Sequence, residues 1–212
     1  MTKRGYFITF EGPEGSGKSS HARPTAYYLE KLGHKVLLTR EPGGTRTGEK
    51  IRGLLQHETT DEEMGIRTEV LLFQASRAQI VYEVIMPALK RNEVVLCDRY
   101  GDSSVAYQGY GREIGAKQIQ ALNRFSTCDL VPDLTFLFDI PAKIGLERVS
   151  ARREGKDRIE RATLNFHERV RQGYLEMARQ EPSRFYIIST LLPFDVVQGA
   201  VEKAIRERLH LG

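Results

Sequence analysis

One stretch decides the fold: Gly12-Pro13-Glu14-Gly15-Ser16-Gly17-Lys18-Ser19, which reads G-x-x-x-x-G-K-S. It follows the apolar run at residues 6–10 and precedes a segment compatible with a helix. In such a loop the glycines let backbone N–H groups wrap a polyphosphate, and the helix turns its positive N-terminal end toward it. Lys18 can then reach the outer phosphates, and the Ser19 hydroxyl suits a Mg²⁺ ligand. The alternative is a glycine-rich turn that binds nothing, but the strand before it and the helix after it favour a phosphate-binding loop.

Five short apolar runs alternate with longer segments of helical periodicity. The runs cover residues 6–10, 35–40, 94–98, 134–139 and 185–190. Strands that alternate with helices indicate a parallel sheet covered on both faces. No internal repeat, low-complexity tract or linker divides the 212 residues. We therefore expect a single domain over residues 1–212, with a three-layer α/β/α P-loop NTPase fold and a five-stranded parallel sheet.

The intervening segments predict the helices. The first should run over residues 17–32 and end at Gly33, with Pro24 inside it as a source of a kink. Further helices are expected at 47–55, at 66–91 with Pro87 bending its end, after Pro141, at 164–180 and at 195–209. In the long helix Phe73 and Arg77 lie one turn apart on one face. Taken alone, Phe73 would be expected to pack in the core and Arg77 to lie on a solvated helix face.

Composition limits the function classes. The chain is 40% hydrophobic and 28% charged, with a formal net charge of +4. Such a basic excess suits nucleic acid or a small anionic substrate, and the spread of the basic residues along the chain favours the small substrate. Cys97 and Cys128 have neither metal-ligand spacing nor the density of a disulfide scaffold, so we expect two buried, inert thiols.

The chain also lacks the usual targeting signals. No apolar run approaches transmembrane length, and the N-terminus enters the first strand and the phosphate loop at once. We therefore expect a cytoplasmic protein without a membrane partner.

The third strand ends in Asp98-Arg99-Tyr100. An acidic residue that closes an apolar strand downstream of a P-loop is the Walker-B arrangement, which holds Mg²⁺ directly or through water. Arg99 follows at the carboxyl end of the strand, where open α/β sheets bind ligands, and a guanidinium there suits a phosphate. If the next residues form a helical turn, Ser104 and Gln108 share a face and could address a nucleobase edge. A polar surface turn remains an equal alternative for that stretch.

The densest basic stretch begins at Arg148 and includes Arg152, Arg153, Lys156, Arg158 and Arg161. A solvated helix face is the usual explanation of such a run. In a phosphoryl-transfer protein the alternative is a mobile arginine-rich lid, here at about residues 150–160, that closes over the transferring phosphate.

Taken together, these motifs resemble the thymidylate kinase family of P-loop nucleoside-monophosphate kinases. The resemblance spans nearly the whole chain and runs in the family's order. It is carried by Phe10-Glu11-Gly12, Arg40-Glu41-Pro42-Gly43-Gly44-Thr45, Phe73 with Arg77, Asp98-Arg99-Tyr100, Ser104 to Gly109, and Asp157-Arg158-Ile159-Glu160.

The resemblance implies how the nucleoside of the acceptor is recognised. Phe73 is similar to the ring that stacks on thymine, and Arg77 to the donor to its exocyclic oxygen. Ser104 and Gln108 are similar to further contacts with the base edge. Tyr107 is similar to the tyrosine that crowds the 2′ position and so favours deoxyribose.

The resemblance also implies the ligands of the acceptor's phosphate and sugar. Arg99 and Arg52 are similar to the ligands of that phosphate, in a loop shaped by Glu41 and Pro42. Glu14 occupies the acidic position of the P-loop, which is expected to orient the acceptor through its 3′-hydroxyl.

On the donor side, the family implies that residues 12–19 hold ATP and that Arg148 lies near its adenine. Ser19, Asp98 and Glu160 would serve the magnesium site.

One departure within the family is informative. Some members carry an arginine just after the acidic residue of the P-loop, whereas this chain has Gly15. The positive charge on the transferring phosphate should therefore come from the lid, from Arg152, Arg153 or Arg158. This resembles the bacterial type with a basic lid. Ser20-His21 and Pro24 depart from the family's usual pattern in the first helix.

We therefore expect transfer of the γ-phosphoryl group of Mg·ATP to dTMP, on the route to dTTP, with Lys18, Arg99, Glu14 and the lid arginines in catalysis. The family also suggests a homodimer. A kinase for another monophosphate or for a deoxynucleoside is the nearest alternative. A P-loop switch protein would need a guanine-specificity N-K-x-D motif, which is not evident. A nucleic-acid-dependent ATPase would need a basic stripe interleaved with aromatics, which is not evident either.

Overall fold

The structure, a computed structural model, describes residues 4–56, 63–151 and 158–211. Within these ranges the strands form one sheet in the order β2-β3-β1-β4-β5, and every neighbouring pair is parallel. The strands are β1 (Phe7–Glu11), β2 (Val36–Arg40), β3 (Val94–Asp98), β4 (Leu134–Asp139) and β5 (Phe185–Ser189). Each lies within one residue of the run that predicted it, and the three-layer α/β/α fold is confirmed.

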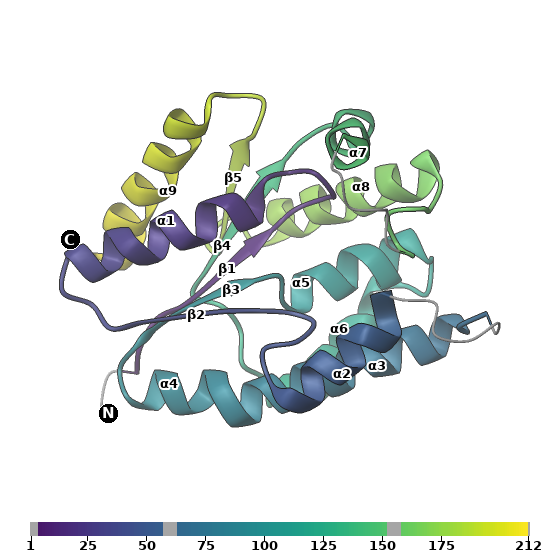
Figure 1. Cartoon of the computed structure of the whole chain (residues 1–212), viewed down its shortest axis with the longest axis horizontal. Coiled ribbons are helices and arrows are strands. Elements are labelled where there is room, and N and C mark those ends of the chain that lie inside the picture. The colour runs from purple at the N-terminus through teal and green to yellow at the C-terminus, as the bar shows by residue number, and fades with distance from the viewer. Residues whose placement is uncertain (1–3, 57–62, 152–157, 212) are drawn as a thin grey trace.

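Helices surround the sheet (Figure 1). They are α1 (Lys18–Lys31), α2 (Arg46–Gln56), α3 (Ile66–Ile80), α4 (Met86–Lys90), α5 (Gly101–Ser104), α6 (Ala116–Thr127), α7 (Ala142–Ser150), α8 (Leu164–Gln180) and α9 (Phe194–Leu209), with π-helical turns η1 (Val81–Ile85) and η2 (Val105–Gly111). Across the described ranges none of these helices has the length and apolar character needed to cross a membrane.

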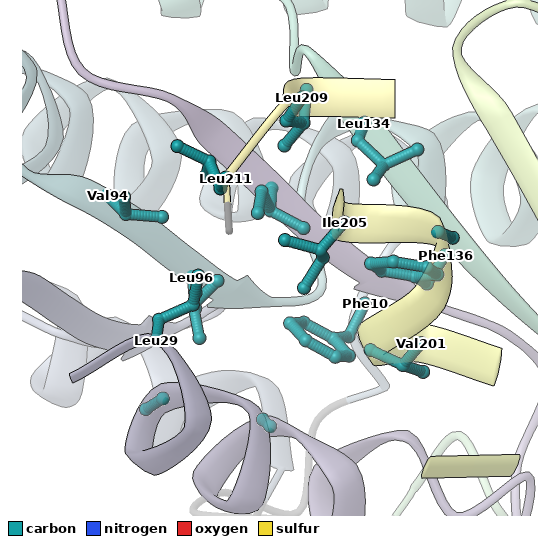
Figure 2. Close-up of a cluster of buried hydrophobic side chains, with 14 of the residues drawn as sticks. Phe10, Leu29, Val94, Leu96, Leu134, Phe136, Val201, Ile205, Leu209 and Leu211 are labelled. Atoms are coloured by element: carbon teal, nitrogen blue, oxygen red, sulfur yellow. The ribbon is translucent and has the colours of Figure 1, made fainter. Parts of the chain in front are cut away.

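The core follows from the alternation of side chains along each strand, which sends neighbours to opposite faces. Ile8 and Phe10 join the cluster beneath α1 and α9, whereas Phe7 packs on the opposite face against η1 and α4. Figure 2 shows the first cluster, where Phe10 and Phe136 from the sheet lie beside side chains of α9. Burying an aromatic or branched side chain contributes about 1.5–3 kcal/mol, so this layer fixes the sheet that carries the site.

The prolines act differently in the two long helical segments. The segment predicted at 66–91 is helical throughout, but η1 separates α3 from α4 directly before Pro87. Proline lacks an N–H and its ring crowds the carbonyl four residues earlier, so a π-helical turn accommodates it locally. In α1, by contrast, Pro24 does not divide the helix, which ends before Gly33 as predicted.

The two cysteines differ, which corrects the expectation of two buried thiols. Cys97 is buried in β3, where burial raises the pKa of its thiol well above the usual range. Cys128 is exposed at the end of α6, with a left-handed backbone at φ 51°. Cys128 is exposed because α6 ends at Thr127, so residue 128 lies outside the packed part of the helix.

Candidate active site

A pocket of about 720 Å³ opens at the carboxyl edge of the sheet, where β1 leads into the P-loop and β3 into Arg99. This is where open α/β sheets bind ligands. Its walls come from the P-loop, the loop after β2, and helices α2, α3 and α5 with η2. The lining residues are Glu14, Lys18, Ser19, Arg40, Glu41, Pro42, Arg52, Leu55, Gln56, Phe73, Asp98, Arg99, Ser103, Ser104, Tyr107, Gln108, Val149, Ile159 and Glu160.

The P-loop places Lys18 at the start of α1. Gly17 caps that helix with a left-handed backbone at φ 80°, a conformation that glycine adopts without strain. Lys18 is only 7% exposed. Burial, and then the neighbouring Arg99, lower the pKa of Lys18, while the carboxylates of Glu14 and Asp98 act in the opposite direction. The Lys18 amine thus lies near two carboxylates, and the phosphates of a bound nucleotide would add further negative charge beside it.

Gly15 lies in backbone contact with α7. Its φ is 67°, and a Cβ placed on it would lie 2.1 Å from the carbonyl oxygen of Gly145. A Cβ on Gly145 would in turn lie 2.2 Å from the carbonyl oxygen of Glu14. No side chain fits at position 15 unless α7 moves. An arginine at this position of the loop therefore cannot contact the transferring phosphate.

Arg99 lies at the centre of the pocket's charged end, on a left-handed backbone with φ 69°. Its Nη2 forms a 2.7 Å ion pair with Glu14 Oε1 and donates to the Tyr107 hydroxyl at 3.1 Å. Burial alone would raise the pKa of Glu14, but Arg99, then Lys18, and the hydrogen bond from Tyr107 together lower it to about 2. Glu14 therefore stays ionised and holds the guanidinium against the P-loop.

Glu11 supports the turn that carries Arg99, a role that the sequence analysis missed. Its carboxylate accepts from the Tyr100 backbone N–H at 2.6 Å, the Ser103 hydroxyl at 2.6 Å and the Tyr174 hydroxyl at 2.9 Å. Burial, and then the carboxylate of Asp102, raise the pKa of Glu11 to about 7. A charged residue at the end of the otherwise apolar β1 was the available signal.

The oxygen atoms at the end of β3 fit a divalent cation. The Ser19 hydroxyl donates to Asp98 Oδ2, and Asp98 Oδ1 is buried without a hydrogen-bond partner among the described residues. Such an orphaned acceptor is rare in folded proteins and indicates a missing ligand. Glu160 also reaches the pocket. In the described part of the chain no three His, Cys, Asp or Glu side chains gather around one point, so a cation here would need oxygens from a bound nucleotide.

The opposite end of the pocket carries groups suited to a planar polar ligand. Phe73, Ser104 and Gln108 line the pocket there, as expected from their spacing on α3 and α5–η2. Tyr107 also lines the pocket, but its hydroxyl contacts Arg99 and Glu14 at the charged end. Ser104 Oγ and Glu41 Oε1 are buried and have no hydrogen-bond partner within the described residues. Buried polar atoms without partners cost free energy, so both ends of the pocket are prepared for a ligand with donors and acceptors.

Arg77 is not among the lining residues, although Phe73 one turn earlier is. It is 1% exposed, and its Nε and Nη2 both lie 2.8 Å from Glu41 Oε2. Nη1 donates to Asn123 Oδ1 at 2.8 Å, and Nη2 donates to the carbonyl of Tyr100 at 3.1 Å. Arg77 therefore braces the pocket wall from behind, and its expected contact with a base stays a prediction.

The lid arginines are only partly described. Arg152 and Arg153 lie outside the described residues. Arg158 does not line the pocket, because its Nη2 lies 2.6 Å from Glu69 Oε2 and its Nε donates to the carbonyl of Leu55. Arg148, expected near an adenine, donates to the carbonyls of Thr190 and Gly15 behind the P-loop.

A parallel sheet in this order, a G-x-x-x-x-G-K-S loop and a pocket that combines charged and aromatic side chains together define a P-loop nucleotide kinase. The Thymidylate kinase family matches residues 10–201 of the chain. The chain belongs to the thymidylate kinase family.

Individual relatives agree with this assignment. The chain is 45% identical over 208 residues to the thymidylate kinase of Deinococcus radiodurans, covering 98% of this chain and 99% of that protein. It is 48% identical over 208 residues to the thymidylate kinase of Pseudomonas syringae pv. tomato, with 98% of each covered. The crystal structure of thymidylate kinase from Ehrlichia chaffeensis is similar with a TM-score of 0.76 and 33% identity, over 95% of this chain and 99% of that one.

Proposed function

We propose that this chain transfers the γ-phosphoryl group of ATP to dTMP, giving dTDP and ADP. The observation that carries the proposal is one continuous pocket with Lys18 and Arg99 at one end and Phe73 and Gln108 at the other. A monophosphate that lies along it would place its phosphate beside the P-loop and its base between the aromatic ring and the amide. Family membership supports the same reaction. The proposal treats the chain as one domain that acts in the cytoplasm on small nucleotides.

Positioning and charge provide the catalysis, because the acceptor phosphate is already a nucleophile at neutral pH. The pocket wall holds both nucleotides in line, so that the acceptor oxygen attacks as the bond to ADP breaks. Lys18 neutralises the phosphates of the donor, and Arg99 with Arg52 binds the phosphate of dTMP. Ser19, Asp98 and Glu160 would hold Mg²⁺, which when bound offsets charge on the donor phosphates. Arg152, Arg153 or Arg158 would bring a further cation from the lid.

The contacts proposed for the base and the sugar are made by residues that line the pocket. Phe73 stacks on thymine, while Ser104 and Gln108 address its polar edge. Tyr107 lies beside the 2′ position and Glu14 takes the 3′-hydroxyl. Their positions on the pocket wall support these roles.

The remaining assignments rest on the loop after β2 and on α7. Glu41 and Pro42 shape the wall beside the acceptor's phosphate, and Arg52 Nη1 donates to the Pro42 carbonyl at 3.0 Å. Arg77 holds Glu41 in that wall and would reach the exocyclic oxygen of thymine only by leaving part of this network. Arg148 would approach the adenine of ATP from behind the P-loop.

A homodimer is part of the proposal. The outer sides of α3–η1 and α6 expose Leu71 at 60%, Tyr82 at 81% and Phe125 at 88%. Large apolar side chains this exposed suit a protein interface. Gel filtration at micromolar concentration should give twice the chain mass, and a Phe125→Glu variant should shift the protein toward the monomer.

A coupled assay with ATP, Mg²⁺ and a panel of nucleoside monophosphates tests the proposal. We expect turnover with dTMP above that with dCMP, dAMP and dGMP. Turnover with another nucleoside monophosphate but not with dTMP would show that the chain uses a different acceptor. ATP hydrolysis that DNA stimulates, without turnover of dTMP, would overturn the proposed function.

A further inference from the structure

We infer that Glu69 is a positioning residue that sets base specificity, by holding the Gln108 amide with its carbonyl oxygen toward the base. The inference rests on the proposed function. Glu69 does not line the pocket and would touch no substrate, so it would act through Gln108 alone. Neither the P-loop nor the other motifs of the sequence pointed to it.

The geometry joins three segments at one carboxylate. Glu69 lies on α3 and is 1% exposed, and its Oε1 accepts from Gln108 Nε2 at 2.9 Å. Its Oε2 lies 3.1 Å from Arg112 Nη2 and 2.6 Å from Arg158 Nη2. The closest guanidinium contacts are thus made to Oε2, while Oε1 takes the Gln108 amide together with a longer contact of 3.4 Å from Arg112 Nε. Gln108 is itself 1% exposed and lines the pocket.

The charge on Glu69 decides which way the amide faces. Burial would raise the pKa of Glu69, but the Gln108 hydrogen bond and the charges of Arg112 and Arg158 lower it, so the carboxylate stays ionised near neutral pH. An ionised carboxylate only accepts hydrogen bonds. Gln108 must therefore turn its NH₂ toward Glu69, which leaves Oε1 for the pocket. Among the described residues no donor is bonded to that oxygen.

A fixed carbonyl oxygen selects bases by the protonation of their ring nitrogen. Thymine and uracil carry a hydrogen on N3 and can donate to Oε1, whereas N3 of cytosine is an acceptor and would be repelled. A glutamine free to turn by 180° could satisfy either edge and would discriminate poorly. The buried carboxylate removes that freedom, so the selectivity would come from a residue behind the one that contacts the base.

The Glu69→Gln variant tests this directly, because it keeps the size of the side chain and removes its charge. Arg112 and Arg158 would take the new amide oxygen, so its NH₂ would face Gln108 and turn the carbonyl oxygen of Gln108 away from the base. We expect kcat/KM for dTMP and dUMP to fall together and the dTMP-to-dCMP ratio of kcat/KM to fall at least tenfold. The control Arg112→Gln leaves the Glu69–Gln108 bond in place and should keep the ratio within about threefold of wild type.

A double-mutant cycle separates orientation from folding. Gln108→Leu removes the amide, and adding Glu69→Gln to it should leave the dTMP-to-dCMP ratio unchanged, because Glu69 acts only through Gln108. Three results would each overturn the inference. The dTMP-to-dCMP ratio could be unchanged in the single Glu69→Gln variant, it could fall equally in Arg112→Gln, or the two losses could add in the double variant. If Glu69→Gln does not fold, a Gln108→Leu variant that keeps the wild-type ratio overturns it instead. A wild-type enzyme inactive on both dTMP and dUMP would overturn the proposed function itself, a result that is distinct from all of these.

Discussion

The two ends of the pocket differ in how their ligand-binding groups are held in place. At the phosphate end Lys18, Arg99 and Glu14 bring charges together on a P-loop with left-handed glycines, and Arg99 itself has a positive φ. At the base end Gln108 is fixed from behind by the buried carboxylate of Glu69. One end is charged and uses left-handed backbone, and the other is buried and held by a hydrogen bond between α3 and the π-helical turn η2.

The difference indicates a division of work. A loop that offers several cations can stabilise the charge that moves during phosphoryl transfer, whichever base the acceptor carries. A base end with fixed donors and acceptors can reject a wrong base but contributes little to the chemical step. Variants of the phosphate end should therefore lower kcat, whereas variants of the base end should change KM and base preference.

The largest effect is expected from Arg99→Ala at the phosphate end. By analogy with arginines that stabilise a transferring phosphate, kcat should fall by about 10³–10⁵. Steady-state turnover of dTMP measures it, with far-UV circular dichroism as the check on folding. Arg4→Ala, which removes an exposed ion pair with Asp133, is the control and should keep wild-type kcat. If Arg99→Ala kept more than a tenth of wild-type activity, a catalytic role for Arg99 would be ruled out.

Among the proposed variants, Gly15→Ala should lower the free energy of unfolding most. It adds left-handed strain and a Cβ 2.1 Å from the Gly145 carbonyl oxygen, and together these should lower the free energy of unfolding by about 2–5 kcal/mol. Gly33→Ala is the matched control, since its φ is 87° but no atom lies within 4 Å of the added Cβ, and it should cost about 1 kcal/mol. Equal losses in urea denaturation would show that α7 does not restrain the loop.

The pH dependence of stability should differ between two buried carboxylates, Glu11 behind the turn that carries Arg99 and Glu69 behind Gln108. The folded pKa of Glu11 is raised from 4.5 to about 7, so its folded form retains a proton that the unfolded chain releases, and its contribution to stability falls as pH rises over that interval. Glu69 has a lowered pKa, so its contribution is present above its unfolded pKa and is lost as the solution is acidified. Replacing Glu11 by Gln should therefore remove a decline of about 3 kcal/mol between pH 4.5 and 7.

That decline is measured as the free energy of unfolding in urea at several pH values. Glu69→Gln should leave it intact and alter only the acidic side. The same flattening between pH 4.5 and 7 in both variants would contradict the assignment of opposite shifts to the two carboxylates.

The smallest kinetic effect is expected from Gln108→Ala at the base end. The loss of one base contact should raise the KM for dTMP and lower the preference for dTMP over dCMP by about tenfold, with kcat nearly unchanged. Isothermal titration with dTMP and with dCMP would give the affinities directly. Unchanged dTMP affinity would count against a contact between Gln108 and the base.

Much of this arrangement was predictable because it follows local sequence patterns. The five apolar runs give the strands, the glycine spacing gives the P-loop, and the order of the motifs places Asp98 and Arg99 at the edge beside it. Phe73 and Gln108 reach the pocket as their helical spacing indicated.

The partners that the sequence could not predict come from distant segments. Arg77 and Phe73 share a helix face by spacing, yet Arg77 turns to Glu41, which is 36 positions earlier. Glu69 gathers Gln108 and Arg112 from one distant segment and Arg158 from another, and no local pattern marks such a cluster. Arg40 also lines the pocket and was missed, although it closes β2 as Asp98 closes β3.

The most direct measurement is a crystal structure with dTMP and a non-hydrolysable ATP analogue bound together. The triphosphate should lie on residues 12–19 with Lys18 beside it, the dTMP phosphate at Arg99, and thymine between Phe73 and the carbonyl oxygen of Gln108. The Glu69–Gln108 bond should persist in that complex. A base at the P-loop end, or thymine facing the NH₂ of Gln108, would contradict the division between the two ends.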